Sequence, residues 1–410
     1  YEKNMRMGGH SNTVNIEKNG VTQPVDTGFI VYNEQNYPNL VKLFDYLNVD
    51  TKATSMSFSV SLDNGNFELG SSNLFSFFGQ RSNILKPEFW HLLSDIKRFF
   101  YEAKVFQSRK NQDIQITLGE FLNHGKYGES FINKFILPMG AAIWSAKPNQ
   151  IGQQPAITFI NFFCSHGLLQ FQNPISWRTV IGGSQSYVKK LTASYLDCIQ
   201  LGRAVTSIAR KENSVSITDT MGEKINFDHV IIATHADEAL GLLSDSDKME
   251  NDLLGSFNYT NNNVILHSDP RLMPKRKNVW SSWNFLGDTE VGVSVTYWMN
   301  LLQSISMENP YFVTVNPKFK PHENLLYKTF QYEHPCFTSK AWSAQQKLWT
   351  LQGRRNTWFC GSYFGYGFHE DGLQSGLAVA EELSGLKRPW VLNNDSTRIT
   401  RTQKTAWSSE

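Results

Sequence analysis

Three glycine-bearing corners hold the residues of this chain that are best suited to bind a charged cofactor. They are residues 8–9, 182–183 and 361–372, and each stands beside a predicted strand or helix end. Glycine lets the backbone come close to a bound group, and a helix N-terminus points free N–H donors at negative charge. Any one corner is more often a plain turn. Together, in a mixed α/β chain, they indicate a sheet with a cleft at its strand ends.

The C-terminal corner has the order strand, glycine turn, helix. An apolar run over residues 358–360 stops at Gly361, and from Asp371 onward apolar residues recur at helical spacing. This order predicts a helix start that faces a bound anionic group. The residues by themselves leave the kind of cofactor open.

A second signal lies at the beginning of the sequence. Glu2 is an acidic residue at a predicted strand end, and Gly8 and Gly9 follow it. This arrangement usually stands about 20 residues after a glycine-rich dinucleotide-binding loop. Such a loop would precede Tyr1, so we expect the sequence to begin inside a nucleotide-binding unit, and an upstream GxGxxG loop would complete it.

Composition excludes several classes of function. The 410 residues are 40% hydrophobic, which suits two or three domains or one large unit with an inserted domain. The formal net charge is +2 and the longest cationic run is residues 275–277, so no nucleic-acid binder is expected. Four scattered cysteines and dispersed histidines predict neither a disulfide framework nor a metal site.

The expected location is cytoplasmic, because the sequence shows no signal-peptide core and no run of about 18 apolar residues. A predicted helix over residues 88–104 sets Lys97 and Arg98 opposite Phe99 and Phe100. This pattern fits a helix that lies peripherally on the inner face of the membrane. It also fits a helix that faces a protein core, and we put that interpretation first.

Hydrophobic periodicity predicts the elements that must position the corners. Helices are expected over residues 38–47, 87–104 and 187–196, with a capping box at Thr117 and a helix that ends at Pro138. Residues 393–410 are expected to form a disordered tail. The predicted strands are residues 58–62, 204–209 and 214–218, a buried parallel strand at 229–234, and one antiparallel sheet of 263–267, 279–285, 291–298 and 311–315.

The corners also carry a family resemblance. Residues 2–13 are similar to the E…GGxxxT segment of the flavin-containing amine oxidoreductases, a family that includes monoamine oxidases, protoporphyrinogen oxidases and phytoene desaturases. Asp-Thr-Gly at residues 26–28 resembles the second motif of this family. The resemblance covers nearly the whole chain up to residue 390, because further similar segments follow in the family's order at residues 182–184, 204–208, 230–234 and 357–383.

Three longer motifs resemble a bacterial branch of that family. They are residues 24–34, 138–144 and 363–371. Members of this branch are often encoded beside, or fused to, cyclopropane-fatty-acid synthases. The resemblance therefore implies a small apolar or lipid substrate and a lipid-modifying methyltransferase of that kind as a partner.

The resemblance implies FAD as the cofactor. Glu2 would hold the ribose hydroxyls of the adenosine, and the helix start at Gly372 and Leu373 would present N–H groups to the flavin, where reduction adds negative charge. His10 stands where the family often has arginine. The implied cofactor contacts are Glu2, Gly8, Gly9, His10, Val205, Gly361, Ser362, Asp371, Gly372 and Leu373.

Catalytic residues are harder to assign. His369 and Tyr366 are the candidates near the flavin, and Trp144 and Tyr297 are candidates for a substrate pocket, although each also fits ordinary packing. In flavin dehydrogenation the cofactor carries the hydride chemistry and the protein mainly positions the substrate. A missing acid/base signature is therefore no evidence against an enzyme.

The predicted fold class is α/β, with a discontinuous Rossmann-like FAD-binding domain and a mixed substrate domain of antiparallel sheet plus helices. The expected FAD-binding domain comprises residues 1–48, 176–245 and 350–392, and the substrate domain comprises residues 49–175 and 246–349.

The predicted function is a FAD-dependent oxidoreductase that transfers hydride from an apolar substrate, such as a lipid acyl chain, to flavin N5. Two alternatives stay open. One is a non-catalytic scaffold that partners a lipid-modifying methyltransferase, and the other is a redox-neutral flavin-dependent isomerase.

Overall fold

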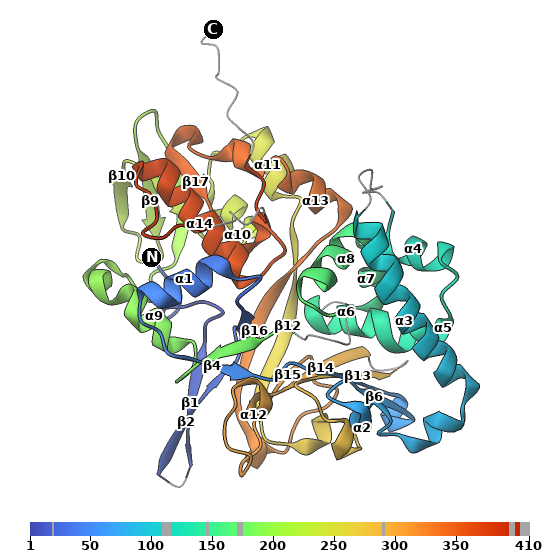
Figure 1. The fold of residues 1–410 in the computed structure, drawn as a ribbon. Coiled ribbons are helices and arrows are strands. Elements are labelled where there is room, and N and C mark those ends of the chain that lie inside the picture. Colours follow the sequence, from blue (N-terminus) through green and yellow to red (C-terminus); the bar gives the residue numbers. More distant parts are fainter. Residues whose placement is uncertain are drawn as a thin grey trace.

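The computed structural model describes residues 1–18, 20–108, 116–144, 147–169, 175–288, 292–392 and 398–401. Figure 1 shows the region around α14 (His369–Ser384) at the upper left, a layer of helices at the right and a large sheet below them. The long strands β12 (Asn258–His267) and β16 (Leu326–Cys336) run between the upper region and the sheet. The chain is thus an α/β protein in which distant segments share cores.

The region around α14 contains two sheets. β11 (Val230–Ile232) pairs in parallel with β17 (Thr357–Phe359), which confirms the predicted buried parallel strand. β8 (Val205–Arg210), β9 (Val215–Asp219) and β10 (Lys224–Phe227) form an antiparallel meander. One core joins β8, β9, β11 and β17 to α14 and to the helices α10 (Ala236–Leu242), α11 (Lys248–Leu254) and α13 (Ser339–Gln345).

A smaller core joins this region to the start of the chain. It packs α1 (Pro38–Tyr46) against α9 (Gln185–Thr192), and Leu373 of α14 lies against it. β7 (Trp177–Val180) pairs with both β3 (Tyr32–Asn33) and β4 (Thr51–Thr54). The hairpin of β1 (Thr13–Lys18) and β2 (Val21–Asp26) projects at the lower left of Figure 1.

The helical layer is the predicted one. α3 (Pro87–Ser108) buries Phe89, Leu92, Ile96 and Phe99, which confirms the core-facing interpretation of this helix. The capping box at Thr117 starts α4 (Leu118–His124) as expected. The largest core of the described residues lies between this layer and the sheet, and its remaining helices are α5 (Glu129–Phe131), α6 (Leu137–Trp144), α7 (Pro148–Gly152) and α8 (Ala156–Ser165).

The prediction that a helix ends at Pro138 is wrong. The chain stays helical from Glu129 to Trp144, and a π-helical stretch, Ile132–Ile136, comes directly before α6. Proline cannot donate the usual backbone hydrogen bond and its ring crowds the preceding turn. A wider π turn just before it gives the ring room, so the helix continues.

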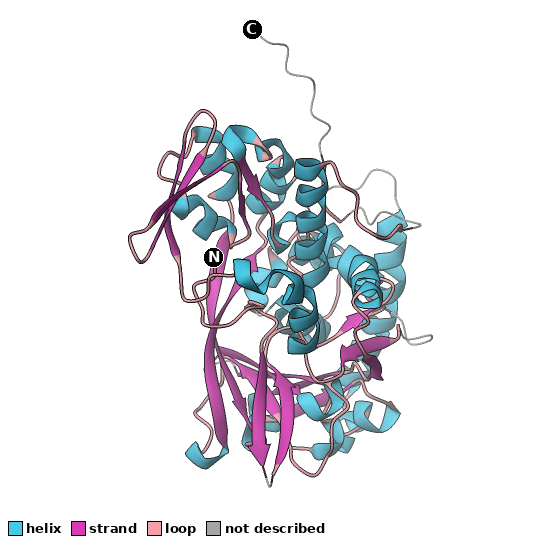
Figure 2. Cartoon of the chain, turned by 90° about the vertical axis from the view of Figure 1, so that its left-hand side faces the viewer, coloured by secondary structure: helices cyan, strands magenta, loops and turns pink. Residues whose placement is uncertain are grey.

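The large sheet has seven strands in the order β16-β12-β15-β14-β13-β5-β6. The four predicted strands are neighbours and antiparallel, so that part of the prediction is confirmed: β12, β15 (Phe312–Val315), β14 (Gly292–Trp298) and β13 (Trp283–Asp288). The sheet also includes β6 (Phe67–Gly70) and β5 (Phe58–Leu62), which runs parallel to β13. Figure 2 shows these strands gathered at one end of the molecule.

The expectation of a disordered tail fails for the four residues that the structure describes there. Arg398 forms an ion pair with Asp371, its Nε lying 2.8 Å from Oδ1, and Ile399 is buried. The rest of the segment 393–410 lies outside the described residues. Among those described, no helix has the length and apolarity to cross a membrane. The domain boundaries stay a prediction.

Candidate cofactor site

The strand–turn–helix corner is held together by Ser375. Its Oγ accepts a hydrogen bond from the N–H of Gly361 (2.9 Å) and lies 3.1 Å from the carbonyl oxygen of the same residue. A methyl group placed on Gly372 would lie 3.7 Å from the nitrogen of Ser362 and near nothing closer. The end of β17 and the first turns of α14 therefore lie side by side, with room for a methyl group at Gly372.

The helix starts two residues earlier than the sequence pattern indicated, at His369. As a result, the N–H of Gly372 already bonds the carbonyl of Phe368 (3.3 Å), and Leu373 lies beyond the first turn. The prediction that Gly372 presents a free N–H is therefore wrong. The free donors of a helix are those of its first residues, which here are His369 and Glu370.

The side chain of Asp371 points to neighbouring residues of the corner and not to solvent. Its side chain is fully buried, accepts a hydrogen bond from the N–H of Phe368 (2.8 Å) and pairs with Arg398. Burial raises the pKa of this carboxyl above its usual value, and Arg398 opposes the shift. The Asp371 Oδ2 also accepts from Nη2 of Arg398 (3.2 Å), whereas Oδ1 takes part in the ion pair but has no hydrogen-bond partner among the described residues, so a cofactor contact of Asp371 stays a prediction.

Glu370 was missed by the sequence reasoning. Its side chain is fully buried, and its two oxygens accept the backbone N–H groups of Asn39 and Leu40 (3.0 Å each) at the start of α1. The carboxylate therefore ties the start of α1 to the start of α14. The sequence signal was slight, because an acidic residue in the first turn of a helix is common.

The double glycine at the chain start has the geometry of a close approach. Gly8 has φ +109°, and a methyl group there would lie 2.6 Å from the carbonyl oxygen of Ser11. Gly9 has φ +55°, and a methyl group there would meet nothing within 4 Å. The guanidinium of Arg6 donates to the carbonyl of Gly9 (2.8 Å). Arg6 thus supplies a positive charge beside this corner, although no spacing rule pointed to it.

Glu2 lies in an isolated β-bridge and not at the end of a described strand, so that part of the prediction is wrong. It forms a parallel bridge with Leu201, and its Oε1 accepts from the backbone and side-chain nitrogens of Asn4 (2.8 and 2.7 Å). Its Oε2 has no hydrogen bond with a described residue. Val205 begins β8 and is half-buried.

The corner at residues 182–183 has a structural role. Both glycines have positive φ, and a methyl group on Gly183 would lie 2.6 Å from Cγ2 of Thr13. Asp26, of the Asp-Thr-Gly motif, accepts hydrogen bonds from Thr13 Oγ1 (2.6 Å) and from the N–H of Ser184 (2.9 Å). These contacts clamp the β1–β2 hairpin onto the start of α9.

His10 lies in a group of aromatic rings. Its centroid is 4.9 Å from that of Tyr332, 5.9 Å from His334 and 6.3 Å from His235. Burial lowers the pKa of His10 to about 4, so its imidazole is neutral near pH 7. Its Nε2 is buried and has no hydrogen-bond partner among the described residues. A buried polar atom without a partner marks a place where a ligand atom fits.

His369 ends a chain of hydrogen bonds from three segments. Its Nε2 lies 2.7 Å from the hydroxyl of Tyr187, which in turn bonds the hydroxyl of Ser11. The imidazole stacks on Phe29 with centroids 4.1 Å apart. Burial lowers the pKa of His369 to about 4 and raises that of Tyr187 to about 12. The chain therefore consists of neutral groups that can hold or pass a proton.

The helical layer meets this corner through aromatic contacts. Phe368 stacks on Phe162 of α8 (4.8 Å, 19° between rings), and Trp144 packs on Phe162 (4.9 Å). Trp144 is a buried member of the core, and Tyr297 packs edge-on against Trp283 (5.6 Å). Both have packing roles, so their place in a substrate pocket stays a prediction.

Tyr366, the other catalytic candidate, lies against Arg398. The guanidinium carbon of Arg398 is 5.4 Å from its ring centroid, and Trp342 lies 5.8 Å away. Burial raises the pKa of its hydroxyl. The structure does not bring Tyr366 into the Ser11–Tyr187–His369 chain.

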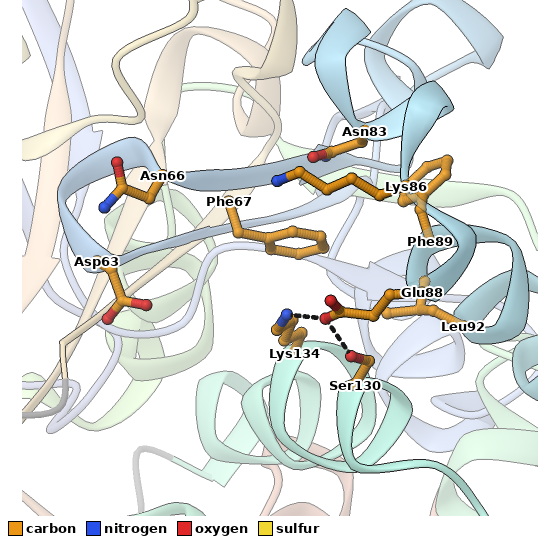
Figure 3. Close-up of a pocket in the computed structure, with 10 residues that line it drawn as sticks. All are labelled: Asp63, Asn66, Phe67, Asn83, Lys86, Glu88, Phe89, Leu92, Ser130 and Lys134. Carbon is orange, nitrogen blue, oxygen red and sulfur yellow. Dashed lines mark hydrogen bonds and ion pairs between the residues drawn. The ribbon is translucent and has the colours of Figure 1, made fainter.

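A cavity of about 180 Å³ lies elsewhere, between β6 and the start of α3. Figure 3 shows its walls, where Glu88 accepts hydrogen bonds from Lys134 and Ser130. None of the predicted site residues lines it. A different cluster, His235, Glu238 and Glu333, brings possible metal-ligand atoms within 4.8 Å of one another. Glu238 is paired there with Lys3 (2.8 Å), and we assign no metal to the group.

These features define a two-region α/β protein with a nucleotide-type cofactor corner. A family model described as flavin containing amine oxidoreductase matches residues 1–311. The chain therefore belongs to the flavin-containing amine oxidoreductases, as the sequence motifs indicated, and its cofactor is FAD. No curated protein matches the sequence.

Solved structures show the same fold at low identity. The CLA-producing fatty acid isomerase from P. acnes has a TM-score of 0.63 and 13% identity, over 93% of this chain and 91% of that one. Cyclohexylamine oxidase from Brevibacterium oxydans IH-35A has a TM-score of 0.61 and 15% identity, over 93% of each chain. A putrescine oxidase bound to putrescine has a TM-score of 0.62 and 12% identity, over 94% of this chain and 93% of that one.

The residues present fit FAD. The free Oε2 of Glu2 suits a ribose hydroxyl. The open side of Gly9, with Arg6 beside it, suits a diphosphate. The buried, unpartnered Nε2 of His10 and the free N–H groups at the start of α14 suit further oxygen atoms of the cofactor.

Alanine at position 372 tests this placement. Because a methyl group fits there in the protein alone, Gly372→Ala is expected to stabilise α14 by about 1 kcal/mol. It is also expected to weaken FAD binding by about 5- to 150-fold, as overpacking costs about 1–3 kcal/mol. Urea unfolding and FAD titration measure the two effects. Gly376→Ala, one turn further on, is the control and should stabilise without loss of FAD; equal losses in both variants would contradict the placement.

Proposed function

We propose that this protein oxidises an apolar substrate, such as a lipid acyl chain, by removing a hydride. FAD, when bound, supplies the hydride acceptor. The observation that supports an apolar substrate is the row of stacked aromatic rings where the cofactor corner meets the helical layer. There Phe368, directly before α14, stacks on Phe162, which stacks in turn on His166 (3.9 Å).

These stacked aromatic rings bear on the class of substrate. Phe159 and Phe163 stack behind Phe162 and Trp144 with centroids 4.0 Å apart, and all four rings are buried, so a wall of packed aromatic rings lies beside the corner. Such a wall favours an apolar chain over a charged amine, because an unpaired charge next to it would lose its hydration.

The chain's own polar groups have separate roles. The free N–H groups of His369 and Glu370 stabilise negative charge at the helix start. The imidazole of His369 holds a proton-accepting nitrogen at the same place, and Tyr187 and Ser11 connect it to the first glycine corner. We assign to these three hydrogen-bonded side chains the transfer of the proton that accompanies hydride removal.

Anaerobic mixing tests the proposal. Full-length protein loaded with FAD is mixed with fatty acids or phospholipids, and the absorbance of oxidised flavin is followed. We expect bleaching and a product lighter by two hydrogen atoms in mass spectrometry. Bleaching by short amines but by no acyl compound would contradict the proposed substrate class.

Two other outcomes assign other functions. A product of unchanged mass that forms only with reduced flavin would make the protein an isomerase. A protein that binds no flavin, but forms a stable complex with a cyclopropane-fatty-acid-synthase-like methyltransferase, would be a scaffold. Either outcome overturns the proposal.

His369→Gln is expected to slow bleaching by about 100-fold, because a positioned proton acceptor contributes at least that factor. Its FAD affinity should stay unchanged, since the backbone donors of the helix start remain. Tyr366→Phe is the control and keeps the rate, because Tyr366 lies outside the hydrogen-bond chain. Stopped-flow absorbance measures both, and a rate unchanged in His369→Gln would remove His369 from the reaction.

A further inference from the structure

An exposed apolar group lies at the start of α3, away from the cofactor corner. Phe75 and Leu85 are each 86% exposed, Trp90 is 50% exposed and Ile84 is 41% exposed. Exposed apolar residues are ordinary when scattered, but a contiguous patch marks an interaction surface. The buried face of α3 belongs to the core, so this surface comes from the first turn of the helix and the segment before it.

The exposed apolar side chains are connected to the core through contacts of Trp90 and Phe78. The indole nitrogen of Trp90 donates to the carbonyl of Ile84 (2.9 Å), which leaves the ring without an unsatisfied donor. The ring of Trp90 lies 6.4 Å from Phe78, and Phe78 lies 5.9 Å from the buried Phe89. Phe75 lies on α2 (Leu74–Phe77), the helix that ends directly before Phe78. The surface is therefore a preformed part of the fold.

Basic residues surround it. The 3-10 turn Lys277–Val279 packs on this segment, where the side chain of Asn278 donates to the carbonyl of Gly79 (3.3 Å). Residues 278–279 therefore lie next to α2, and the cationic run at residues 275–277, the densest of the sequence, leads from there to Gly65 and Glu68, where Lys275 lies. Lys275, Lys277, Arg81 and Lys86 are all exposed.

Two of the nearby carboxylates are already paired, whereas the exposed Asp63 lines the same cavity as Lys86 and has no ion pair among the described residues. Glu68 is buried and bonds Arg276 (2.8 Å), and Glu88 pairs with Lys134. In contrast, Arg81, Lys86, Lys275 and Lys277 have no ion pair within the described ranges of the chain. Four cationic side chains against the one unpaired carboxylate of Asp63 leave an excess of positive charge around an apolar centre.

We propose that this surface docks on an anionic lipid bilayer. Trp, Phe and Leu side chains enter the boundary between headgroups and acyl chains, and lysine and arginine attract anionic headgroups. In Figure 1, α2 and β6 lie at the lower right of the molecule, away from α14. The docking needs no flavin, so it stands or falls apart from the proposed function. The bilayer-docking surface comprises Phe75, Arg81, Ile84, Leu85, Lys86, Trp90, Lys275 and Lys277.

Vesicle sedimentation tests the proposal with the full-length protein. We expect binding to vesicles of phosphatidylcholine mixed with phosphatidylglycerol, weaker binding to pure phosphatidylcholine, and release by added salt. Lys275→Gln/Lys277→Gln should lower the partition coefficient by about 25-fold, since each basic residue at an anionic surface contributes a factor of about five. Phe75→Ser/Leu85→Ser should lower it by about tenfold or more.

Matched variants elsewhere are the controls. Lys211→Gln/Lys224→Gln removes two exposed lysines around β9 and β10, and Leu386→Ser/Val391→Ser removes two equally exposed apolar side chains. These four changes should leave binding intact. Equal losses in controls and test variants, or no preference for anionic vesicles, would overturn the proposal. So would a dimer, seen by sedimentation velocity, that forms without lipid and is broken by Phe75→Ser/Leu85→Ser.

Discussion

Asp371→Ala is expected to lower the free energy of unfolding by about 3–5 kcal/mol, because it leaves the charge of Arg398 buried without its partner. The side chain of Arg398 is only 12% exposed, so water cannot replace the carboxylate. The N–H of Phe368 also loses its acceptor at the start of α14. Urea denaturation of the protein without added FAD measures the change.

The control is Arg401→Gln. Arg401 is 45% exposed and lies 3.9 Å from Glu381, and such an exposed ion pair contributes about 1 kcal/mol at most. If Asp371→Ala were no more destabilising than Arg401→Gln, Asp371 would not hold the corner. The double variant Asp371→Ala/Arg398→Met should recover part of the loss, since it removes the unpaired charge.

Acid is expected to destabilise the protein steeply. His166 and His267 are 3% and 0% exposed, and burial lowers their pKa values to about 3 and about 4. Each is neutral in the folded state and takes up a proton in the unfolded state below its usual pKa of 6.5. The stability that depends on their neutral form is therefore present above about pH 6.5 and is lost as the pH falls toward 4.

The two imidazoles together predict a loss of about 3 kcal/mol per pH unit in that window. The urea midpoint measured between about pH 7 and pH 5 tests this. His267→Gln should make the dependence shallower, whereas His91→Gln, at an exposed position, should leave it unchanged. A pH dependence that is as steep in His267→Gln as in the unchanged protein would show that His267 is not held neutral.

Much of the fold follows from local patterns in the sequence. Thr117 with Glu120 fixes the start of α4, and the apolar run at Val230 fixes a buried parallel strand, since few alternatives satisfy these residues. β16 was missed because polar residues and Pro335 interrupt its alternation, as an edge strand tolerates. Its place in the sheet is set by pairing with β12, at a separation that no local window includes.

The sequence predicted the glycine positions of the candidate site but not the buried charged side chains that hold it in place. Gly8 could be predicted because its φ of +109° and the nearby carbonyl oxygen of Ser11 exclude a side chain, and Gly9 because its positive φ favours glycine. Glu370 and Arg398 act through partners hundreds or tens of residues away, at Asn39 and Asp371, so no spacing rule could find them. The helix start was misplaced by two residues because Phe368 and His369 gave no periodic signal.

The account rests on FAD binding, and titration of the purified full-length protein with FAD tests it most directly. We predict one FAD per chain, a flavin spectrum that stays with the protein after gel filtration, and weaker binding in Gly372→Ala but not in Gly376→Ala. A full-length protein that carries no flavin and takes up none on titration would contradict the central claim.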